Sequence, residues 1–526
     1  MTPSGRDATL AAVLGDSKLS PDRDATLSTP RGGYLLAMIL AASLISLPFL
    51  AVRFPPVTDL PQQAAQVRLF LEYLDGSQLY ALNLAAPGTL GYGVFGLSWL
   101  LAGEENAGRL AYLLLGILWV AALAVTARSY RRSPTLVPLA SLFFFSHLLY
   151  WGFFGFLFGA ALFLLWIALE RRLRATSSQL AEILLLTISG IALYAAHLFW
   201  FLIATAFLLV VTFRSNLPTR RRWLRLAGFT PGLLLLGLWA PRIAASGFES
   251  ETLWWNAPWA RLGPGEMTNR FLGGIHGPVE PVILISLGLW LAIGLWQHRA
   301  DLRSVLEPEL LWLGASMIVL SLLLPDRHQN TLHFAGRWTP IGAGLLLLAL
   351  PPPRIRKPLR WLVALVLLAS LSVTSLAAWK RFEHLELAGL EDSLRALPPN
   401  SSLLGLDYYR LSQFVKTQPF FQIPAYGQAL SGGSLGFSFA SFPASPVVFR
   451  EWENPPWTPG LEWLPHEIFE SLDDLLYFDF VLIHADEPGQ LFFERQPSLT
   501  PLTPSARWRL YRVVPSVPAD SRASIQ

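Results

Sequence analysis

Between residues 34 and 378 the chain repeatedly contains apolar runs of about 15–20 residues, close to the ~20 that cross a hydrocarbon core of about 30 Å as a helix. The composition agrees with burial in lipid, because only 14% of the residues are charged, whereas soluble proteins carry about 25%. The sequence therefore predicts a polytopic α-helical membrane protein.

Eleven of these runs are predicted to cross the membrane. They are 34–52, 109–127, 135–150, 153–170, 179–197, 199–213, 227–243, 280–296, 309–324, 338–352 and 360–378. Cytoplasmic loops are enriched in Lys and Arg, so the positions of the arginines predict the orientation. The arginine-rich turns, all predicted to be cytoplasmic, are 128–132, 171–174, 214–222 and 354–360. The alternate turns, 244–279 and 325–337, then face outward, and the N-terminus lies inside.

The loop after the first crossing, residues 53–108, is predicted to form a structured outer platform with two membrane-lying helices. Residues 62–75 mix apolar and charged side chains, as interfacial helices do. Residues 87–103 are apolar enough to cross, but a crossing there would place the arginines of 128–132 outside, against the charge rule. Five glycines also weaken this segment as an isolated helix. We therefore predict that it lies along the outer surface.

The remaining parts of the chain are more polar. Residues 1–33 are predicted to be a disordered cytoplasmic tail in front of the transmembrane domain, residues 34–379. Residues 380–526 contain short apolar runs separated by Pro- and Gly-containing loops, which predicts an extracytoplasmic α/β domain. Its predicted strands are 402–406, 446–449, 478–484 and 507–514, and its predicted helices are 385–397 and 466–477.

Composition also argues against several classes of protein. The chain has no cysteine, which excludes disulfides, thiolate metal sites and a cysteine nucleophile. A net charge of +4, scattered along the chain, does not suggest nucleic acid as a partner. A transporter would need ionisable residues in the middle of its spans, and the predicted spans have almost none. His147 and His197 fall near the outer ends of their helices, where a hydrogen bond to a carbonyl explains them most simply.

One carboxylate stands out in the first outer loop. Asp59 lies in the stretch RFPPVTDLPQQ, where Pro55, Pro56 and Pro61 restrict the backbone. A carboxylate held in one place can act as a general base on a hydroxyl when burial or a neighbour tunes its pKa. The alternative is that Asp59 only ends the segment and caps the following helix.

This order of elements resembles the GT-C superfamily of membrane glycosyltransferases. The shared features are an N-terminal crossing, an acidic outer loop with two membrane-lying helices, many further crossings and a C-terminal extracytoplasmic α/β domain. Three stretches look similar to those of bacterial members: TDLPQQAAQ, SHLLYWGFFGFLFGAALFLLWIALERRLR and FAGRWTPIGAGLLLLAL. As architecture, the resemblance covers most of residues 34–378.

The resemblance implies a role for Asp59 as catalytic base or metal partner, because members of the family carry an acidic residue in the first outer loop. Many members have an Asp-Glu pair there, whereas Leu60 follows Asp59 in this chain. A divalent metal is compatible with the resemblance, and nothing in the sequence requires one. The implied donor is a polyprenyl-phosphate sugar.

Cationic side chains gather between two predicted crossings, in the stretch PDRHQNTLHFAGRW. Arg327, His328, His333 and Arg337 would lie at the outer headgroup level, where they could bind a lipid phosphate, Arg through paired hydrogen bonds. The alternative is ordinary interfacial anchoring of a short loop. A His–Asp–His metal site is a further alternative.

The predicted outer loop 244–279 is rich in aromatic and acidic residues. Trp255 could stack on a sugar ring, and Glu249 and Glu251 could accept hydrogen bonds from sugar hydroxyls. The alternative is an aromatic belt, because the membrane interface itself enriches tryptophan.

The resemblance implies an inverting glycosyltransferase of the cytoplasmic membrane, while composition and spacing supply the topology and the candidate positions. Its partners would be a lipid-linked sugar donor and membrane lipids, and transfer to an acceptor hydroxyl would take place at the outer face. The alternative is a non-catalytic scaffold or assembly protein that presents the C-terminal domain to a partner.

Overall fold

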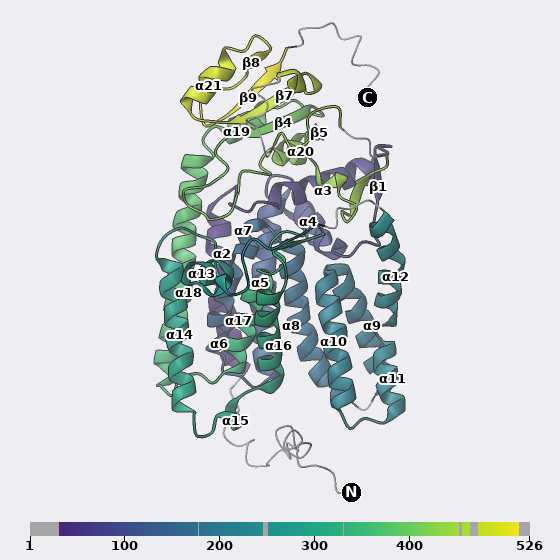
Figure 1. The fold of residues 1–526 in the computed structure, drawn as a ribbon, viewed down its shortest axis with the longest axis vertical. Coiled ribbons are helices and arrows are strands. Elements are labelled where there is room, and N and C mark those ends of the chain that lie inside the picture. The colour runs from purple at the N-terminus through teal and green to yellow at the C-terminus, as the bar shows by residue number, and fades with distance from the viewer. Residues whose placement is uncertain are drawn as a thin grey trace.

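The computed structural model describes residues 31–176, 178–245, 251–329, 331–451, 455–462 and 472–514. Most of the predicted tail and Glu249 therefore lie outside the described residues. Figure 1 shows a bundle of long helices with a small β-sheet at one end. This is the predicted fold class, a polytopic helical protein with a C-terminal α/β region.

The eleven predicted crossings all coincide with apolar helices. Six helices of the described residues are long and apolar enough to cross a membrane by length and composition. They are α2 (Arg31–Ala51), α5 (Ala107–Ser129), α8 (Phe154–Arg174), α9 (Gln179–Ala196), α14 (Val279–Gln297) and α18 (Lys357–Arg381). A seventh span is formed if α11 (Thr219–Ala227) and α12 (Thr230–Ala245), which meet at a bend of 43°, are counted together.

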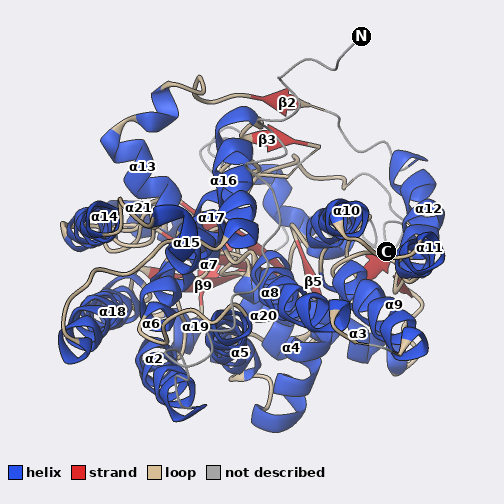
Figure 2. Ribbon diagram, turned by 90° about the horizontal axis from the view of Figure 1, so that it is seen from below, coloured by secondary structure: helices blue, strands red, loops and turns tan. Residues whose placement is uncertain are grey.

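The other four predicted crossings are shorter apolar helices. They are α6 (Leu136–Ser141) with α7 (His147–Trp151), α10 (Leu198–Arg214), α16 (Pro308–Leu323) and α17 (Trp338–Ala349). A 3-10 turn, Leu142–Phe145, joins α6 to α7. In Figure 2 the helices are seen from the end of the bundle opposite to the sheet, with α10 and α16 on either side of α8.

The arginine-rich turns gather at that same end. Arg132 donates hydrogen bonds to the carbonyls of Val305 and Leu348, which joins the 128–132 turn to α15 (Leu302–Val305) and to the last turn of α17. Arg225 on α11 is buried between Glu170 and Glu182. The charge clusters that the sequence places on one side of the membrane therefore lie at one end of the bundle.

The loop after α2 contains two helices, as predicted. These are α3 (Leu60–Leu74) and α4 (Thr89–Ala102). α4 keeps an exposed apolar face, with Leu100 82% exposed. α3 differs from an interfacial helix, because most of its first ten residues are buried and it packs against α20 (Ala425–Ser431) of the C-terminal region.

The C-terminal region contains a five-stranded mixed sheet. In spatial order its strands are β5 (Ser434–Leu435), β4 (Ser402–Asp407), β7 (Phe480–His484), β9 (Trp508–Val513) and β8 (Leu499–Pro501). The first three are parallel and the last two pair antiparallel. Helices α19 (Leu390–Ala396), α20 and α21 (Glu487–Glu494) pack around them.

Three of the four predicted strands are in this sheet, and the fourth is elsewhere. β6 (Val447–Phe449) pairs instead with β1 (Tyr80–Leu82) of the outer loop. Of the predicted helix 385–397, only α19 is α-helical, and it follows a π-helical turn at Phe382–Glu386. Of the predicted helix 466–477, residues 472–477 form a 3-10 helix, and the residues before them lie outside the described residues.

The two faces of the sheet belong to different cores. Successive side chains of a strand point to opposite faces, so Leu403 and Leu482 belong to one core cluster while Leu404 and Val481 belong to another. The first cluster is continuous with the interior of the helical bundle. The sheet is therefore attached to the bundle through a shared hydrophobic core.

Candidate functional site

Three segments meet near the end of the bundle that carries the sheet: the end of the loop before α3, the end of α7, and the loop before α17. The amides of Thr58 and Asp59 donate hydrogen bonds to the carbonyls of Tyr150 (2.9 Å) and Trp151 (3.3 Å). Gly152 has a positive φ of 84°, and a Cβ there would lie 2.6 Å from the Asp59 nitrogen. Only glycine permits this conformation and this close approach at low cost, so the α7–α8 turn fixes the position of Asp59.

Asp59 occupies the N-cap position of α3, but its side chain makes no capping hydrogen bond. Among the described residues its carboxylate has no hydrogen-bond or ion-pair partner. The residue as a whole is partly exposed, whereas its carboxyl group is buried. Burial raises the pKa of the Asp59 carboxyl to about 7, and the positive charge of Arg337 opposes that rise. The capping alternative therefore does not explain this side chain.

Arg337 lies at the start of α17, close enough to Asp59 to interact with it electrostatically. Its guanidinium donates to the carbonyl of Leu332 through Nε (3.1 Å) and Nη2 (2.9 Å), and lies 3.8 Å from the centre of the Phe153 ring. It is buried, and no carboxylate of the described residues lies within ion-pair distance. Burial lowers the pKa of Arg337 to about 10, with Asp59 opposing the change. Asp59 and Arg337 therefore interact electrostatically without forming a direct salt bridge.

Two histidines and two tryptophans surround Arg337. His333, at a positive φ of 52°, has its ring 4.7 Å from Trp151 and 5.1 Å from Trp255, measured between centroids. Burial and the charge of Arg337 lower the pKa of His333 to about 4, so it is neutral at pH 7. His147 is buried, and neither of its ring nitrogens has a hydrogen-bond partner, so the carbonyl bond expected from the sequence is not formed.

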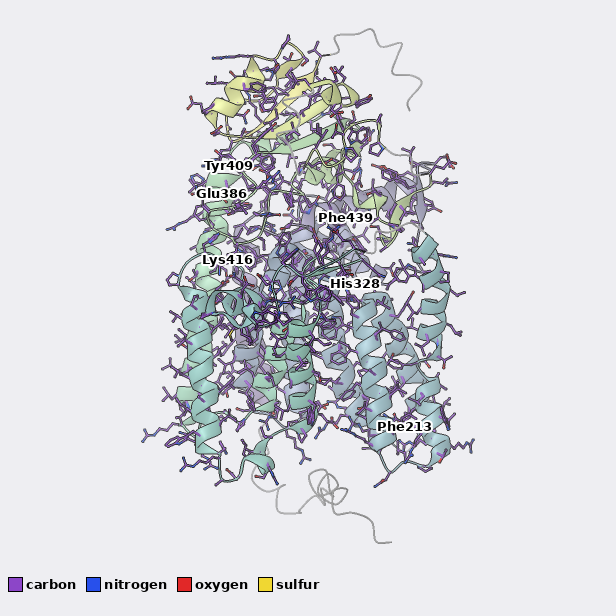
Figure 3. The ribbon with its side chains drawn as sticks, in the orientation of Figure 1. Phe213, His328, Glu386, Tyr409, Lys416 and Phe439 are labelled. Carbon is purple, nitrogen blue, oxygen red and sulfur yellow. The ribbon has the colours of Figure 1, made fainter. Side chains whose placement is uncertain are left out.

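The other described site residues predicted from the sequence lie on or beside a separate two-stranded antiparallel sheet. β2 (Thr252–Leu253) pairs with β3 (Arg327–His328). Arg327 forms an ion pair with Glu251 at 3.1 Å, and His328 Nδ1 lies 2.9 Å from the Thr252 hydroxyl. Figure 3 shows His328 near mid-height, below Phe439. Electrostatic and ring contacts thus link Asp59 to Arg337, Arg337 to His333, and His333 to Trp255. Arg327 is instead paired with Glu251, and His328 with Thr252.

A small cavity of about 140 Å³ lies beside Asp59. Its lining residues are Gln63, Gly88, Gly91, Tyr92, Phe95, Phe154 and Gly155. Gln63 stands one helical turn after Asp59 on the same face of α3, and Tyr92 is close enough to interact electrostatically with the Asp59 carboxylate. Sequence reasoning missed these two residues, although the i, i+4 spacing and the glycines of 87–103 were the available signals.

A metal site is a separate question. Among the described ranges, no three His, Asp or Glu side chains are grouped so as to hold a metal ion. Asp326, which would belong to a His–Asp–His site, instead accepts hydrogen bonds from Arg261 (2.8 Å) and Arg270 (2.9 Å). Its role is to hold the two outer loops together.

The helical bundle with the docked C-terminal sheet is a fold that two solved proteins share. The crystal structure of ArnT from Cupriavidus metallidurans bound to undecaprenyl phosphate matches with a TM-score of 0.52 and 12% identity, over 93% of this chain and 99% of that one. The cryo-EM structure of the arabinofuranosyltransferase AftD from Mycobacteria matches with a TM-score of 0.51 and 15% identity. That match covers 93% of this chain and 40% of AftD.

Both proteins are GT-C membrane glycosyltransferases, and at these identities the likeness shows the fold alone. No protein-family model matches the sequence, and no curated protein matches it.

The raised pKa of Asp59 predicts a pH-dependent gain in stability for Asp59→Asn. In the unfolded chain Asp ionises near pH 4, whereas the folded protein retains the proton up to about pH 7. Between these values the folded state binds more protons, so wild-type stability falls as pH rises and stays low above pH 7. Thermal unfolding in detergent should therefore show a Tm gain for Asp59→Asn that is a few degrees larger at pH 8 than at pH 5.

The control for this experiment is Asp75→Asn, which removes an exposed carboxylate at the other end of α3. Its Tm difference from wild type should be similar at the two pH values. A pH-independent effect of Asp59→Asn would contradict the buried environment assigned to Asp59.

Proposed function

We propose that this protein transfers a sugar from a polyprenyl-phosphate donor to an acceptor hydroxyl at the outer face of the cytoplasmic membrane. The observation that carries the proposal is the buried Asp59 carboxylate, which has no hydrogen-bond or ion-pair partner among the described residues and interacts electrostatically with the buried Arg337. The GT-C fold supports it, and the ArnT structure with the same fold contains undecaprenyl phosphate.

In this mechanism Asp59 is the general base. A carboxylate whose pKa is about 7 is largely ionised at slightly alkaline pH and is basic enough to accept a proton from a hydroxyl in the transition state. The acceptor oxygen attacks the anomeric carbon as the bond from that carbon to the phosphate oxygen breaks. The electron pair of that bond leaves with the phosphate, the proton moves to Asp59, and the anomeric configuration is inverted.

Arg337 would bind the donor phosphate and stabilise the negative charge that develops on it. Its Nε and Nη2 are used by the Leu332 carbonyl, and no protein acceptor binds Nη1 among the described residues. A charge-assisted hydrogen bond from Nη1 would therefore compete with no carboxylate. Trp255, which packs against His333, and Phe154, which lines the small cavity, provide faces on which a sugar ring can stack.

The proposed orientation places the arginine-rich end of the bundle in the cytoplasm and the sheet outside. Because the chain has no cysteine, single cysteines can report it directly. In whole cells, a membrane-impermeant maleimide should label Gln78→Cys without further treatment and Arg172→Cys only after permeabilisation. Both positions are exposed. The reverse pattern would invert the topology and remove the outer-face assignment.

Asp59→Asn should lower the rate of transfer from a lipid-linked donor by a factor of about 10² to 10⁴, because the amide cannot accept the proton. The measurement is transfer of labelled sugar in membranes containing matched amounts of folded protein. Asp75→Asn is the control and should retain the wild-type rate. If Asp59→Asn turned over normally, another carboxylate such as Glu251 would have to be the base. A wild-type protein that binds and transfers from no donor would favour the scaffold alternative.

Arg337→Gln should weaken donor binding by up to about 3 kcal/mol, the upper range for a hydrogen bond to a charged group. It should also move the acidic limb of the pH–rate profile to higher pH, because the charge of Arg337 lowers the pKa of Asp59. Arg327→Gln should do neither, since Glu251 already pairs with that guanidinium. Equal effects of the two variants would place the phosphate between the arginines instead of at Arg337.

A further inference from the structure

A second, larger cavity lies on the side of the bundle, far from Asp59. It is a groove of about 660 Å³ between α10 and α16. Its lining residues are Arg174, Ile203, Ala206, Phe207, Val210, Val211, Arg214, Ser215, Pro308, Glu309, Trp312, Leu313, Ser316, Met317 and Leu320. Figures 1 and 2 agree that α10 and α16 stand on either side of α8. The groove therefore lies between two helices, and its lining is almost entirely apolar apart from Arg174, Arg214 and Glu309.

The length of the groove corresponds to one leaflet of a bilayer. On α10 the lining residues run from Ile203 to Arg214 at helical spacing, and on α16 they run from Glu309 to Leu320 in the same way. Eleven residues of α-helix rise about 16 Å, and half of a hydrocarbon core is about 15 Å. A single lipid chain that enters at one membrane surface would extend along the whole groove.

The charges of the groove are all at one end, which is the arginine-rich end. Arg174 and Glu309 there neutralise one another through a direct ion pair. Arg214 is exposed and has no ion-pair partner among the described residues. Its neighbour Phe213 is visible in Figure 3 at the end of the bundle away from the sheet. The positive N-terminus of α16, which begins at Pro308, opens at the same end and also favours a negative group.

We infer that this groove binds an anionic phospholipid from the leaflet on the arginine-rich side, with its phosphate at Arg214 and one acyl chain between α10 and α16. The position of Arg214 favours a phospholipid over the polyprenyl-phosphate donor as the ligand of this groove. A polyprenyl phosphate held at Arg337 would place its charge at the opposite end of the bundle, where this groove has no charged residue. The inference does not depend on the proposed sugar transfer.

Native mass spectrometry of the full chain in detergent tests this inference, with phosphatidylglycerol and phosphatidylcholine of identical acyl chains as probes. Phosphatidylglycerol should bind more tightly. Arg214→Gln should weaken its binding about fivefold, which corresponds to the ~1 kcal/mol contributed by one basic residue near an anionic lipid. Arg220→Gln, an exposed arginine outside the groove, should leave binding unchanged.

Ala206→Trp fills the groove from an exposed position on α10 and should abolish retention of the lipid. Leu209→Trp is its matched control, because Leu209 is 40% exposed on the same helix but does not line the groove. All variants are compared as monodisperse protein, so a folding defect is seen separately. Equal binding of the two lipids, equal binding by the two tryptophan variants, or displacement of phosphatidylglycerol by undecaprenyl phosphate at equal concentration would each overturn the inference.

Discussion

Three glutamines of α3, Gln62, Gln63 and Gln66, are buried between the helical bundle and the C-terminal region, and each makes at least one hydrogen bond. Gln62 donates to Gln422 (3.0 Å) and to the Phe437 carbonyl (3.0 Å), on the sheet side. Gln63 donates to the Gly152 carbonyl (2.7 Å), on the bundle side. A buried amide that loses its partner costs about 1–3 kcal/mol, so α3 is fixed from both sides. Asp59 immediately precedes this helix, and its position depends on these bonds.

Much of the fold can be predicted from the sequence, because the residues of a segment themselves determine whether it lies in lipid, in the protein core or in water. Long apolar runs predict the bundle helices, and short apolar runs between Pro- and Gly-containing loops predict β4, β7 and β9. The hydrogen-bond partners of polar groups, by contrast, can be far away in the sequence. Gln62 and Gln422 are 360 residues apart, and β6 pairs with β1 across a similar separation. A pattern within α3 therefore indicates an interfacial helix, whereas helix α20, which packs against it, is encoded elsewhere in the chain.

In the candidate site, too, the residues can be found from the sequence but their partners cannot. Asp59 and Arg337 are recognisable from their loops, but the ion pair that engages Arg327 with Glu251 depends on the pairing of two short strands. The arginine-rich end is similar, because Arg225 is neutralised by two buried glutamates while Arg214 stays exposed. Counting charges in a turn indicates which end of the bundle it occupies. It does not indicate which of those charges are available to a ligand.

The separation between Asp59 and Arg337 matters more for the proposed chemistry than either residue alone. A direct salt bridge would hold the pKa of Asp59 low and would leave a weak base. It would also use the hydrogen bonds of Arg337 that a phosphate needs. Here the Asp59 carboxylate still stabilises the buried guanidinium of Arg337 through a longer-range electrostatic interaction. Both groups can therefore be charged without using each other's hydrogen bonds. A donor phosphate against Arg337 and an acceptor hydroxyl against Asp59 would occupy the space between them, which is where bond exchange at the anomeric carbon has to occur.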